Sequence, residues 1–348
     1  MINRELIRIK VIHVIYSYYQ QGDNQLDHAE KELLKSMSRA YDLYNCLLQL
    51  IVEVHRMAMR TYETELSRYQ RIHEGEAPSS KFADNLFANQ LGSNRQLRQY
   101  AESSNPWAND EDFIRRIYKR VVESTAYQEY MADDNVVDKA AAYERDREVW
   151  RRLYKQVFMK YDDLDDVLEE KDLYWNDDRF IIDTFVLKTI NRFSVRSSIG
   201  QELMPEYRDM EDLDFAKLLL RASLLTESTA HSLISQFLRN WDLNRLAFMD
   251  LIIMQTALAE MLTFQQIPIS VTINEYVDIA KAYSTPQSGR YVNGLLDAIA
   301  RHLIQTGRLQ KEMAPASKSA PVDTADESMP DAAVSDASDE VPLTPVQP

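Results

Sequence analysis

The sequence predicts an all-α protein, and three observations lead to this fold class. Apolar residues recur at intervals of three and four along most of the chain, which is the period of an α-helix. No stretch alternates strictly between apolar and polar residues, as a half-buried strand would. Only seven of the 348 residues are glycine, and they are scattered, so we do not expect a glycine-rich phosphate-binding loop.

Breaks in the helical pattern divide the chain into four parts. The stretch 74–80 is polar, Gly200 and Pro205 mark a second boundary, and from about Gln310 the chain is rich in Ala, Pro, Ser and Asp without periodicity. The expected parts are N-terminal helices over 1–73, a large helical insertion over 74–205, a C-terminal helical bundle over 206–309 and a disordered acidic tail over 310–348.

The periodic segments predict the individual helices in order. The first helix is apolar on almost every face and should be buried. The second is long and begins at Asp27, with Glu30 three residues later as a cap. Ser228 is a cap signal for a later helix, and Thr272 with Glu275 fits a capping box. The helices are expected over about 6–19, 27–73, 81–102 (the weakest), 110–131, 136–161, 179–193, 213–225, 229–240, 243–264, 271–283 and 287–304.

The charge of the chain limits how it can bind nucleic acid. The formal net charge is −15, and the residues from Ala314 onward contain seven acids and one lysine, a net of −6 that leaves −9 for the rest. A body this acidic should not attract nucleic acid through its overall field. Any RNA contact therefore requires a local basic patch, helped by a partner.

Signals for catalysis or metal binding are missing from the sequence. No two of the six histidines have the His-x-x-x-His spacing of a helical zinc site, and there is no Gly-x-Ser-x-Gly motif. The acidic run from Asp162 to Asp166 contains no glycine for a calcium loop, so a solvated face or helix cap is the better interpretation. Cys46, the one cysteine, should be a small buried residue. We therefore expect no enzymatic activity, no cofactor and no metal.

The sequence also predicts a cytoplasmic protein. The first residues lead straight into a helix without an apolar secretory segment. The most apolar stretch, 246–264, is interrupted by Asp250, Gln255 and Glu260, which makes it too polar to span a bilayer. We expect no contact with a membrane.

Two blocks near the C-terminus carry a family resemblance. The first reads Ile-Asn-Glu-Tyr-Val-Asp-Ile-Ala-Lys over residues 273–281, and the second reads Tyr-Val-Asn-Gly-Leu-Leu-Asp over residues 291–297. This pair resembles the C-terminal signature of the NusB family of transcription antitermination factors. On this resemblance, the bundle over 206–309 is the NusB-like part of the chain.

The N-terminal helix is similar to the family pattern as well. Family members open with an arginine-rich helix that ends in Leu-Tyr, and here Arg4 and Arg8 lie one turn apart, followed by Lys10 and Tyr16. The resemblance covers about 1–22 and 212–305. Long members of the Bacteroidetes type look like this chain, because they have an extra helical region between the two recognisable parts.

The resemblance implies a non-enzymatic helical adaptor. Family members pair with NusE, a small ribosomal subunit protein that doubles as an elongation factor. The pair binds the boxA element of nascent RNA, and the complex joins RNA polymerase to suppress termination in ribosomal RNA operons. The implied partners are therefore a NusE-type small ribosomal subunit protein, boxA-like single-stranded RNA and the RNA polymerase elongation complex.

Seven residues are candidates for these contacts. Cationic side chains can contact phosphate, and a tyrosine at the start of a helix can stack on a base. Tyr16 and Asp250 match family positions near the NusE surface, and a carboxylate on an apolar helix face needs water, an internal partner or another chain. The candidate RNA-binding residues are Arg4, Arg8, Lys10, Arg290 and Tyr291, and the candidate partner-binding residues are Tyr16 and Asp250.

Other interpretations stay open at this point. Tyr291 can instead pack into the core, and Asn274, Glu275 and Asn293 are expected to be structural, with Glu275 capping its own helix and Asn293-Gly294 allowing close helix packing. The chain can be a helical scaffold that does not bind RNA. It can also be an RNA-binding lobe related to RNA methyltransferases, although that requires a Rossmann-like domain with a glycine-rich loop.

Overall fold

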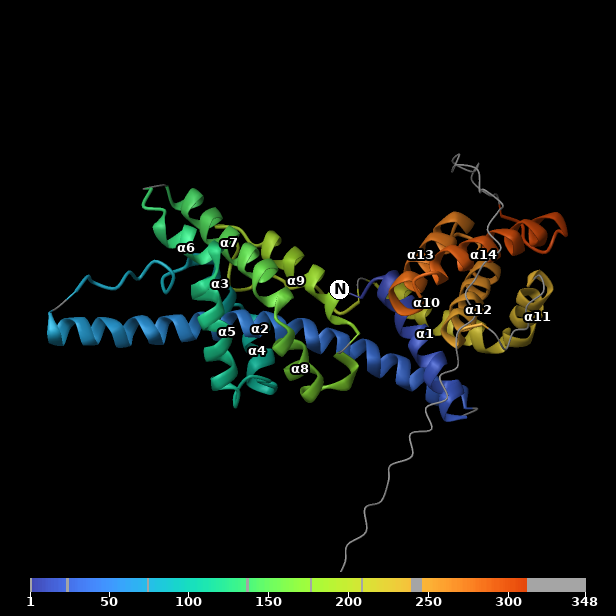
Figure 1. Cartoon of the computed structure of the whole chain (residues 1–348), viewed down its shortest axis with the longest axis horizontal. Helices are drawn as coiled ribbons and strands as arrows, with labels where there is room; N and C mark the ends of the chain where they lie inside the picture. The colour runs from blue at the N-terminus through green and yellow to red at the C-terminus, as the bar shows by residue number, and fades with distance from the viewer. Residues whose placement is uncertain are drawn as a thin grey trace, which may run out of the picture. The chain divides into compact units, whose positions relative to one another are not determined.

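The computed structural model describes residues 2–22, 25–73, 75–135, 138–175, 177–207, 209–238 and 246–311. Within these residues the chain forms fourteen α-helices, two short 3-10 helices and no β-strand, apart from one isolated bridge between Ile2 and Tyr207 (Figure 1). The prediction of an all-α protein is confirmed. The predicted tail lies, except for its first two residues, outside the described part of the chain.

The helices follow the predicted order with two kinds of exception: the predicted helices 81–102 and 110–131 each form two helices, and the helix Asp162–Lys171 was not predicted. The first half of the chain contains α1 (Arg4–Gln21), α2 (Leu26–Ile72), α3 (Leu86–Gly92), α4 (Arg95–Ser103), α5 (Glu111–Glu123), α6 (Thr125–Ala132) and α7 (Lys139–Gln156). The second half contains η1 (Phe158–Lys160), α8 (Asp162–Lys171), η2 (Leu173–Trp175), α9 (Arg179–Arg192), α10 (Met210–Leu225), α11 (Glu227–Phe237), α12 (Phe248–Thr263), α13 (Ile269–Tyr283) and α14 (Ser288–Gln305).

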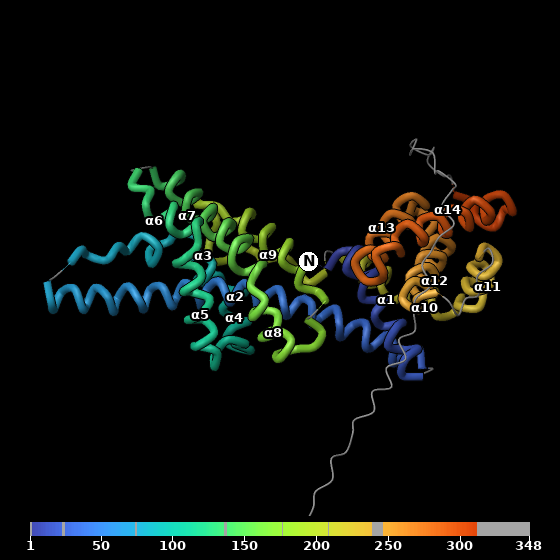
Figure 2. Tube along the Cα trace, in the orientation of Figure 1, coloured from blue at the N-terminus to red at the C-terminus, as the bar shows by residue number. Residues whose placement is uncertain are grey.

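Helices α3 to α9 gather around the long helix α2, and α10 to α14 gather near α1 (Figure 2). Helix α1 contacts α2, α10 and α12, so it belongs to both groups. Nine of the ten residues from Leu6 to Ile15 in α1 are buried, as the sequence predicts. All described residues lie in one compact unit, Met1–Glu312. The predicted boundaries near residues 74 and 205 fall inside this unit and stay predictions.

Several predicted helix starts and ends are wrong for local reasons. The segment 110–131 is two helices because Ser124 ends α5 and accepts a hydrogen bond from the Tyr127 amide at the start of α6. The acidic run from Asp162 opens α8, where its carboxylates lie in the first turn and interact favourably with the helix dipole. Asp27 lies inside the first turn of α2 and makes no cap, and α11 begins before Ser228.

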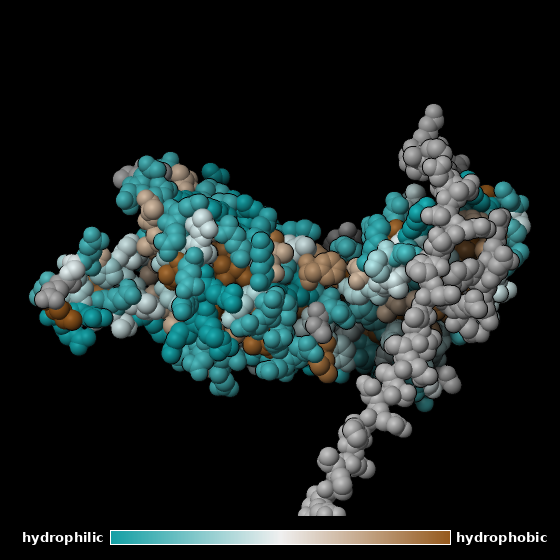
Figure 3. All heavy atoms as spheres, in the orientation of Figure 1, coloured by the Kyte–Doolittle hydropathy of each residue, from teal (hydrophilic) through white to brown (hydrophobic). Residues whose placement is uncertain are grey.

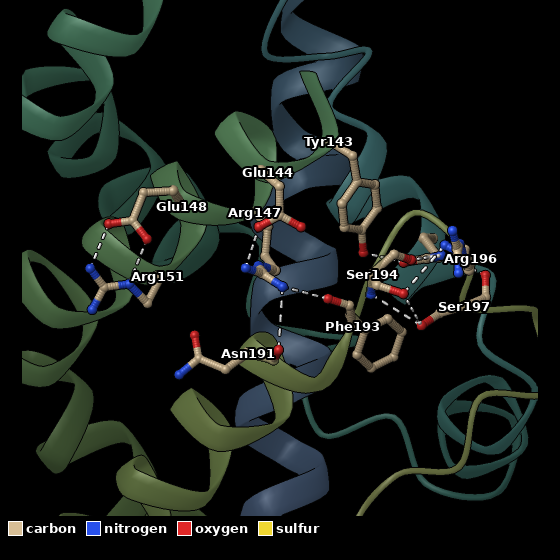
Figure 4. A network of polar contacts seen from close by, with 11 residues as sticks. Tyr143, Glu144, Arg147, Glu148, Arg151, Asn191, Phe193, Ser194, Arg196 and Ser197 are labelled. Atoms are coloured by element: carbon tan, nitrogen blue, oxygen red, sulfur yellow. Dashed lines mark hydrogen bonds and ion pairs between the residues drawn. The ribbon is translucent and has the colours of Figure 1, made fainter. Parts of the chain in front are cut away.

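The carboxyl end of α9 shows how one side chain holds two helices together. The guanidinium of Arg147, on α7, donates hydrogen bonds to the carbonyl oxygens of Phe193 at 2.8 Å and Asn191 at 3.3 Å. Figure 4 shows the side chain reaching across to these carbonyls while it also pairs with Glu144. The last carbonyls of a helix have no partner within the helix. Arg147 therefore caps α9 from a neighbouring helix.

We expect Arg147→Ala to lower the free energy of unfolding by about 1 kcal/mol, because two carbonyls lose a charged donor at a half-buried site. Arg151→Ala is the matched control. Arg151 lies one turn further along α7 and, among the described residues, pairs only with exposed Glu148, a contact worth under about 0.5 kcal/mol. Urea unfolding followed by circular dichroism measures both. Equal effects of the two substitutions would contradict the capping role.

Candidate functional site

Arg8, which we predicted to contact RNA, lies in the interior. Its side chain is 4% exposed, and the guanidinium donates hydrogen bonds to the two carboxylate oxygens of Glu260, from Nε at 2.8 Å and from Nη2 at 3.0 Å. Nη1 donates to Glu275 Oε2 at 3.0 Å. Burial alone would lower the pKa of Arg8, but the bonds to Glu260 raise it above its ordinary value. The guanidinium stays charged, and with three N–H groups bonded to carboxylates it is turned away from solvent, where a phosphate would bind.

Glu260 is the centre of this buried cluster. Its side chain is fully buried, and it also accepts hydrogen bonds from the hydroxyls of Thr272 at 2.8 Å and Tyr276 at 3.1 Å. Thr272 and Glu275 lie inside α13, whose cap residue is Pro268, so they do not form the capping box we predicted. The two residues instead belong to a polar network that joins α1, α12 and α13.

Lys10 is buried for a similar reason. Its Nζ lies 2.5 Å from Oδ2 of Asp178, which is fully buried immediately before α9. Burial raises the pKa of Asp178 to about 6, and Lys10 opposes this rise. Burial also lowers the pKa of the neighbouring His13 to about 4. Lys10 therefore neutralises an internal carboxylate and, like Arg8, does not present its charge to solvent.

Arg4 is the one predicted cation of α1 that remains near the surface. Its side chain is 32% exposed, with Nε 3.7 Å from Asp212 Oδ1 on α10. Its guanidinium carbon lies 5.0 Å from the centre of the Phe215 ring. The weak ion pair leaves Arg4 available for a further contact.

The starts of α12 and α14 meet at Asp250. This carboxylate is buried, and its Oδ2 accepts a hydrogen bond from the Ser288 hydroxyl at 2.8 Å. Its Oδ1 has no hydrogen bond from the residues that the structure describes. Asp250 thus has an internal partner, which is one of the outcomes we expected for a carboxylate on an apolar face. Its side chain holds the first turns of the two helices together.

Aromatic side chains lie at the surface around this junction. The rings of Tyr16 on α1 and Phe248 on α12 are 5.5 Å apart, and Tyr19 lies 6.1 Å from Phe248. Tyr16 is 37% exposed and Phe248 is 38% exposed. Arg290 and Tyr291 are exposed in the first turn of α14, with Tyr291 at 37%. Tyr291 does not pack into the core, and we name these five residues the α1–α12–α14 surface.

Two features of this region were not predicted from the sequence. Phe248 was not a predicted site residue, because the predicted helix 243–264 placed it inside the helix, whereas α12 begins at Phe248. Asn293 and Gly294 are exposed, and a Cβ at Gly294 would meet nothing within 4 Å, so they do not mediate close packing. The close approach is at Gly289, where a Cβ would lie 2.6 Å from Lys281 Cγ.

The described part of the chain has neither a cluster of metal-binding side chains nor an exposed thiol. No group of three or more His, Cys, Asp or Glu side chains there is arranged to hold a metal ion. Cys46 is buried, as predicted, and burial raises the pKa of its thiol far above the ordinary value. None of the helices that the structure describes combines the length and apolar character that a bilayer crossing requires.

Comparison with known proteins identifies the family. Residues 181–301 match the model of the NusB family. The chain is 40% identical over 108 residues to transcription antitermination protein NusB of Salinibacter ruber, which covers 31% of this chain and 68% of that protein. It is 39% identical over 109 residues to NusB of Dictyoglomus thermophilum (31% and 76%) and 36% identical over 121 residues to NusB of Dictyoglomus turgidum (34% and 84%).

A solved structure of T. maritima NusB is also similar, with 30% identity, coverage of 44% of this chain and 90% of that chain, and a TM-score of 0.27. The sequence relatives show that this chain is a transcription antitermination protein of the NusB family, whose members are not enzymes. The family match begins within the segment predicted as an insertion and does not include residues 1–22. The likeness of the first helix to the family therefore stays a prediction.

We expect Arg8→Met to destabilise the protein by about 3–5 kcal/mol, because it leaves Glu260 as a buried charge without a cationic partner. Arg115→Met is the control. Arg115 pairs with Glu111 and Asp112 on α5, and all three side chains are more than half exposed, so the cost should stay below about 0.5 kcal/mol. Thermal and urea unfolding report both values. If Arg8→Met proved as mild as Arg115→Met, the cluster would not hold the fold together.

Proposed function

We propose that this chain is a transcription antitermination adaptor that binds boxA-like nascent RNA together with a NusE-type ribosomal protein. The complex then joins the RNA polymerase elongation complex at ribosomal RNA operons. Membership of the NusB family supports this proposal. So does the exposure of Arg290 and Tyr291 in the first turn of α14, at the start of the second signature block. We also propose that the chain is a long form of the Bacteroidetes type.

RNA binding is assigned to the residues that remain accessible. Arg290 and Tyr291 are successive exposed residues in the first turn of α14, and a cation and an aromatic ring at a helix start suit a phosphate and an unstacked base. Arg4 can add a phosphate contact. Arg8 and Lys10, which we predicted to bind RNA, are not part of this proposal. Both side chains are buried in ion pairs, with Glu260 and Asp178 respectively.

Protein binding is assigned to the aromatic part of the α1–α12–α14 surface. Tyrosine and phenylalanine at a protein surface supply large apolar area at small entropic cost, which is why aromatic residues are enriched in interfaces. Tyr16 and Phe248 lie in contact and are both more than one third exposed. Asp250 contributes from beneath this surface by holding α12 against α14 through Ser288.

A helical scaffold without RNA binding is the second candidate. One observation favours it: two of the three cations that we predicted on α1 are internal. An acidic body with few free cations at the predicted site would then rely on protein contacts alone. The following measurement separates the two candidates.

Fluorescence anisotropy of a labelled boxA-like single-stranded RNA, measured from low to high salt, tests RNA binding. We expect weak binding alone, tighter binding with the NusE homologue, and affinity that falls as salt rises. Arg290→Ala with Tyr291→Ala should weaken the ternary complex by about tenfold or more, since one stacked base contributes about 1–3 kcal/mol.

The matched control for this pair is Arg68→Ala with Tyr69→Ala, an adjacent Arg-Tyr pair on α2 that lies outside the proposed surface. This double variant should bind RNA like the wild type. No RNA binding under any condition would leave the scaffold as the better description. Equal losses in the two double variants would refute the assignment to α14.

Binding of the NusE homologue without RNA tests the protein interface. We expect Tyr16→Ala to weaken this complex by about tenfold, because exposed tyrosines at the centre of an interface commonly contribute 1–2 kcal/mol or more. Tyr62→Ala on α2 is the control and should have no effect. Isothermal titration calorimetry measures both. Wild-type affinity for Tyr16→Ala would exclude this surface as the partner site.

A further inference from the structure

A second surface, separate from the one described above, lies around the exposed ring of Phe180 at the start of α9. Two hollows of about 570 Å³ and 250 Å³ flank this residue, and both are lined by Phe180, Ala282 and Tyr283. Phe180 is 53% exposed, which is unusual for a phenylalanine. We call the two hollows and their shared ring the Phe180 groove. In Figure 3 the visible face is mostly hydrophilic, with an apolar patch between the positions of α9 and α13.

The groove forms where the middle segment of the chain meets the NusB-like helices. Helix α9, α8 and η1 supply one side, with Met159 among the lining residues. Helices α1 and α13 supply the other side through Ile9 and Ile279. The hydroxyl of Tyr283 donates to the backbone carbonyl of Asp177 at 3.2 Å and ties the two sides together.

The lining of the groove is strongly acidic. Among the described lining residues, six carboxylates accompany one cation, Arg179. Arg179 is itself occupied, because it pairs with Asp165 and lies 3.6 Å from Asp183. The six carboxylates are Glu5, Glu275 and Asp278 in the smaller hollow and Asp165, Asp177 and Asp183 in the larger one.

Two of these carboxylates have no counter-ion in the described part of the chain. Glu275 pairs with Arg8, and Asp278 pairs with Lys281 at 2.7 Å. Glu5 and Asp177, by contrast, are exposed and make no ion pair with any described residue. They lie on the smaller and the larger hollow respectively, so each hollow has a free negative charge beside the ring of Phe180.

The raised pKa of the Tyr283 hydroxyl agrees with a negative electrostatic potential in the Phe180 groove. Burial raises the pKa of its hydroxyl, and the negative charges of Asp177, Asp178 and Glu5 raise it further. A tyrosine whose ionisation is opposed by three carboxylates lies in a field that attracts cations.

We propose that the Phe180 groove docks a basic, arginine-containing segment of a partner protein, with cationic side chains on both sides of the Phe180 ring. A guanidinium stacks on an aromatic face and simultaneously donates to nearby carboxylates. Phe180 and Tyr283 supply the faces, and Asp177 and Glu5 supply the free carboxylates. Charge complementarity therefore selects the partner.

Other possible occupants of the groove carry negative charge. The tail of this chain from Ala314 onward has a net charge of −6, and a second copy of the remaining chain brings −9, so both are repelled. RNA is repelled as well, because its backbone is anionic. The proposal does not rest on the function proposed above, since the groove shares no residue with the α1–α12–α14 surface.

Binding of a fluorescein-labelled hepta-arginine peptide to the full chain tests this inference, with labelled hepta-glutamate as the negative probe. We expect the arginine peptide to bind and its affinity to fall as salt rises. Phe180→Ala should weaken binding by about fivefold through the loss of cation–π stacking. Glu5→Gln with Asp177→Asn should weaken it by about tenfold and flatten the salt dependence.

Matched controls remove the same groups elsewhere. Leu225→Ala removes a more exposed apolar side chain on α10, and Glu63→Gln with Asp134→Asn removes two exposed carboxylates far from the groove in sequence. Both should change the affinity less than twofold. Absence of peptide binding to the wild type, or losses in the controls equal to those in the groove variants, would overturn the proposal.

Discussion

The ion pair between Arg8 and Glu260 is the contact on which the NusB-like part of the structure depends. A fully buried carboxylate in the last turn of an apolar helix is costly unless every oxygen lone pair is used, and here one guanidinium and two hydroxyls use them. The pair joins residues 252 positions apart, so the first helix and the last third of the chain must fold together. Glu275 extends the same contact to α13.

This constraint changes how the basic residues of α1 are understood. From Leu6 to Ile15 helix α1 is buried on almost every face, so the charges of Arg8 and Lys10 must meet internal carboxylates. Arg8 does so in the NusB-like bundle, and Lys10 does so with Asp178 at the start of α9. Helix α1 thus connects the bundle to the middle segment. The exposed candidate residues lie elsewhere: Tyr16 in the second half of α1, and Phe248 and Arg290 in the first turns of α12 and α14.

The sequence predicted helices better than helix starts. Periodicity identified α2, α9, α12 and α13 because their apolar stripes are long. Cap signals were less reliable, since Thr272 and Glu275 have the spacing of a capping box and yet serve Glu260 and Arg8. A polar side chain can form a hydrogen bond with the free amides at the start of its own helix or with a residue far away in the sequence. The local sequence does not show which of the two partners it will have.

By itself the sequence determined the helical fold class, the buried character of α1 and Cys46, and the family, because periodicity, composition and signature blocks are local properties. It also placed Tyr291 and Arg290 at a helix start, which they occupy with their side chains exposed. Only the tertiary structure decided which charges face solvent. Arginine and lysine look alike in sequence whether they are solvated or paired, and the choice depends on carboxylates such as Glu260 and Asp178 that lie far away along the chain.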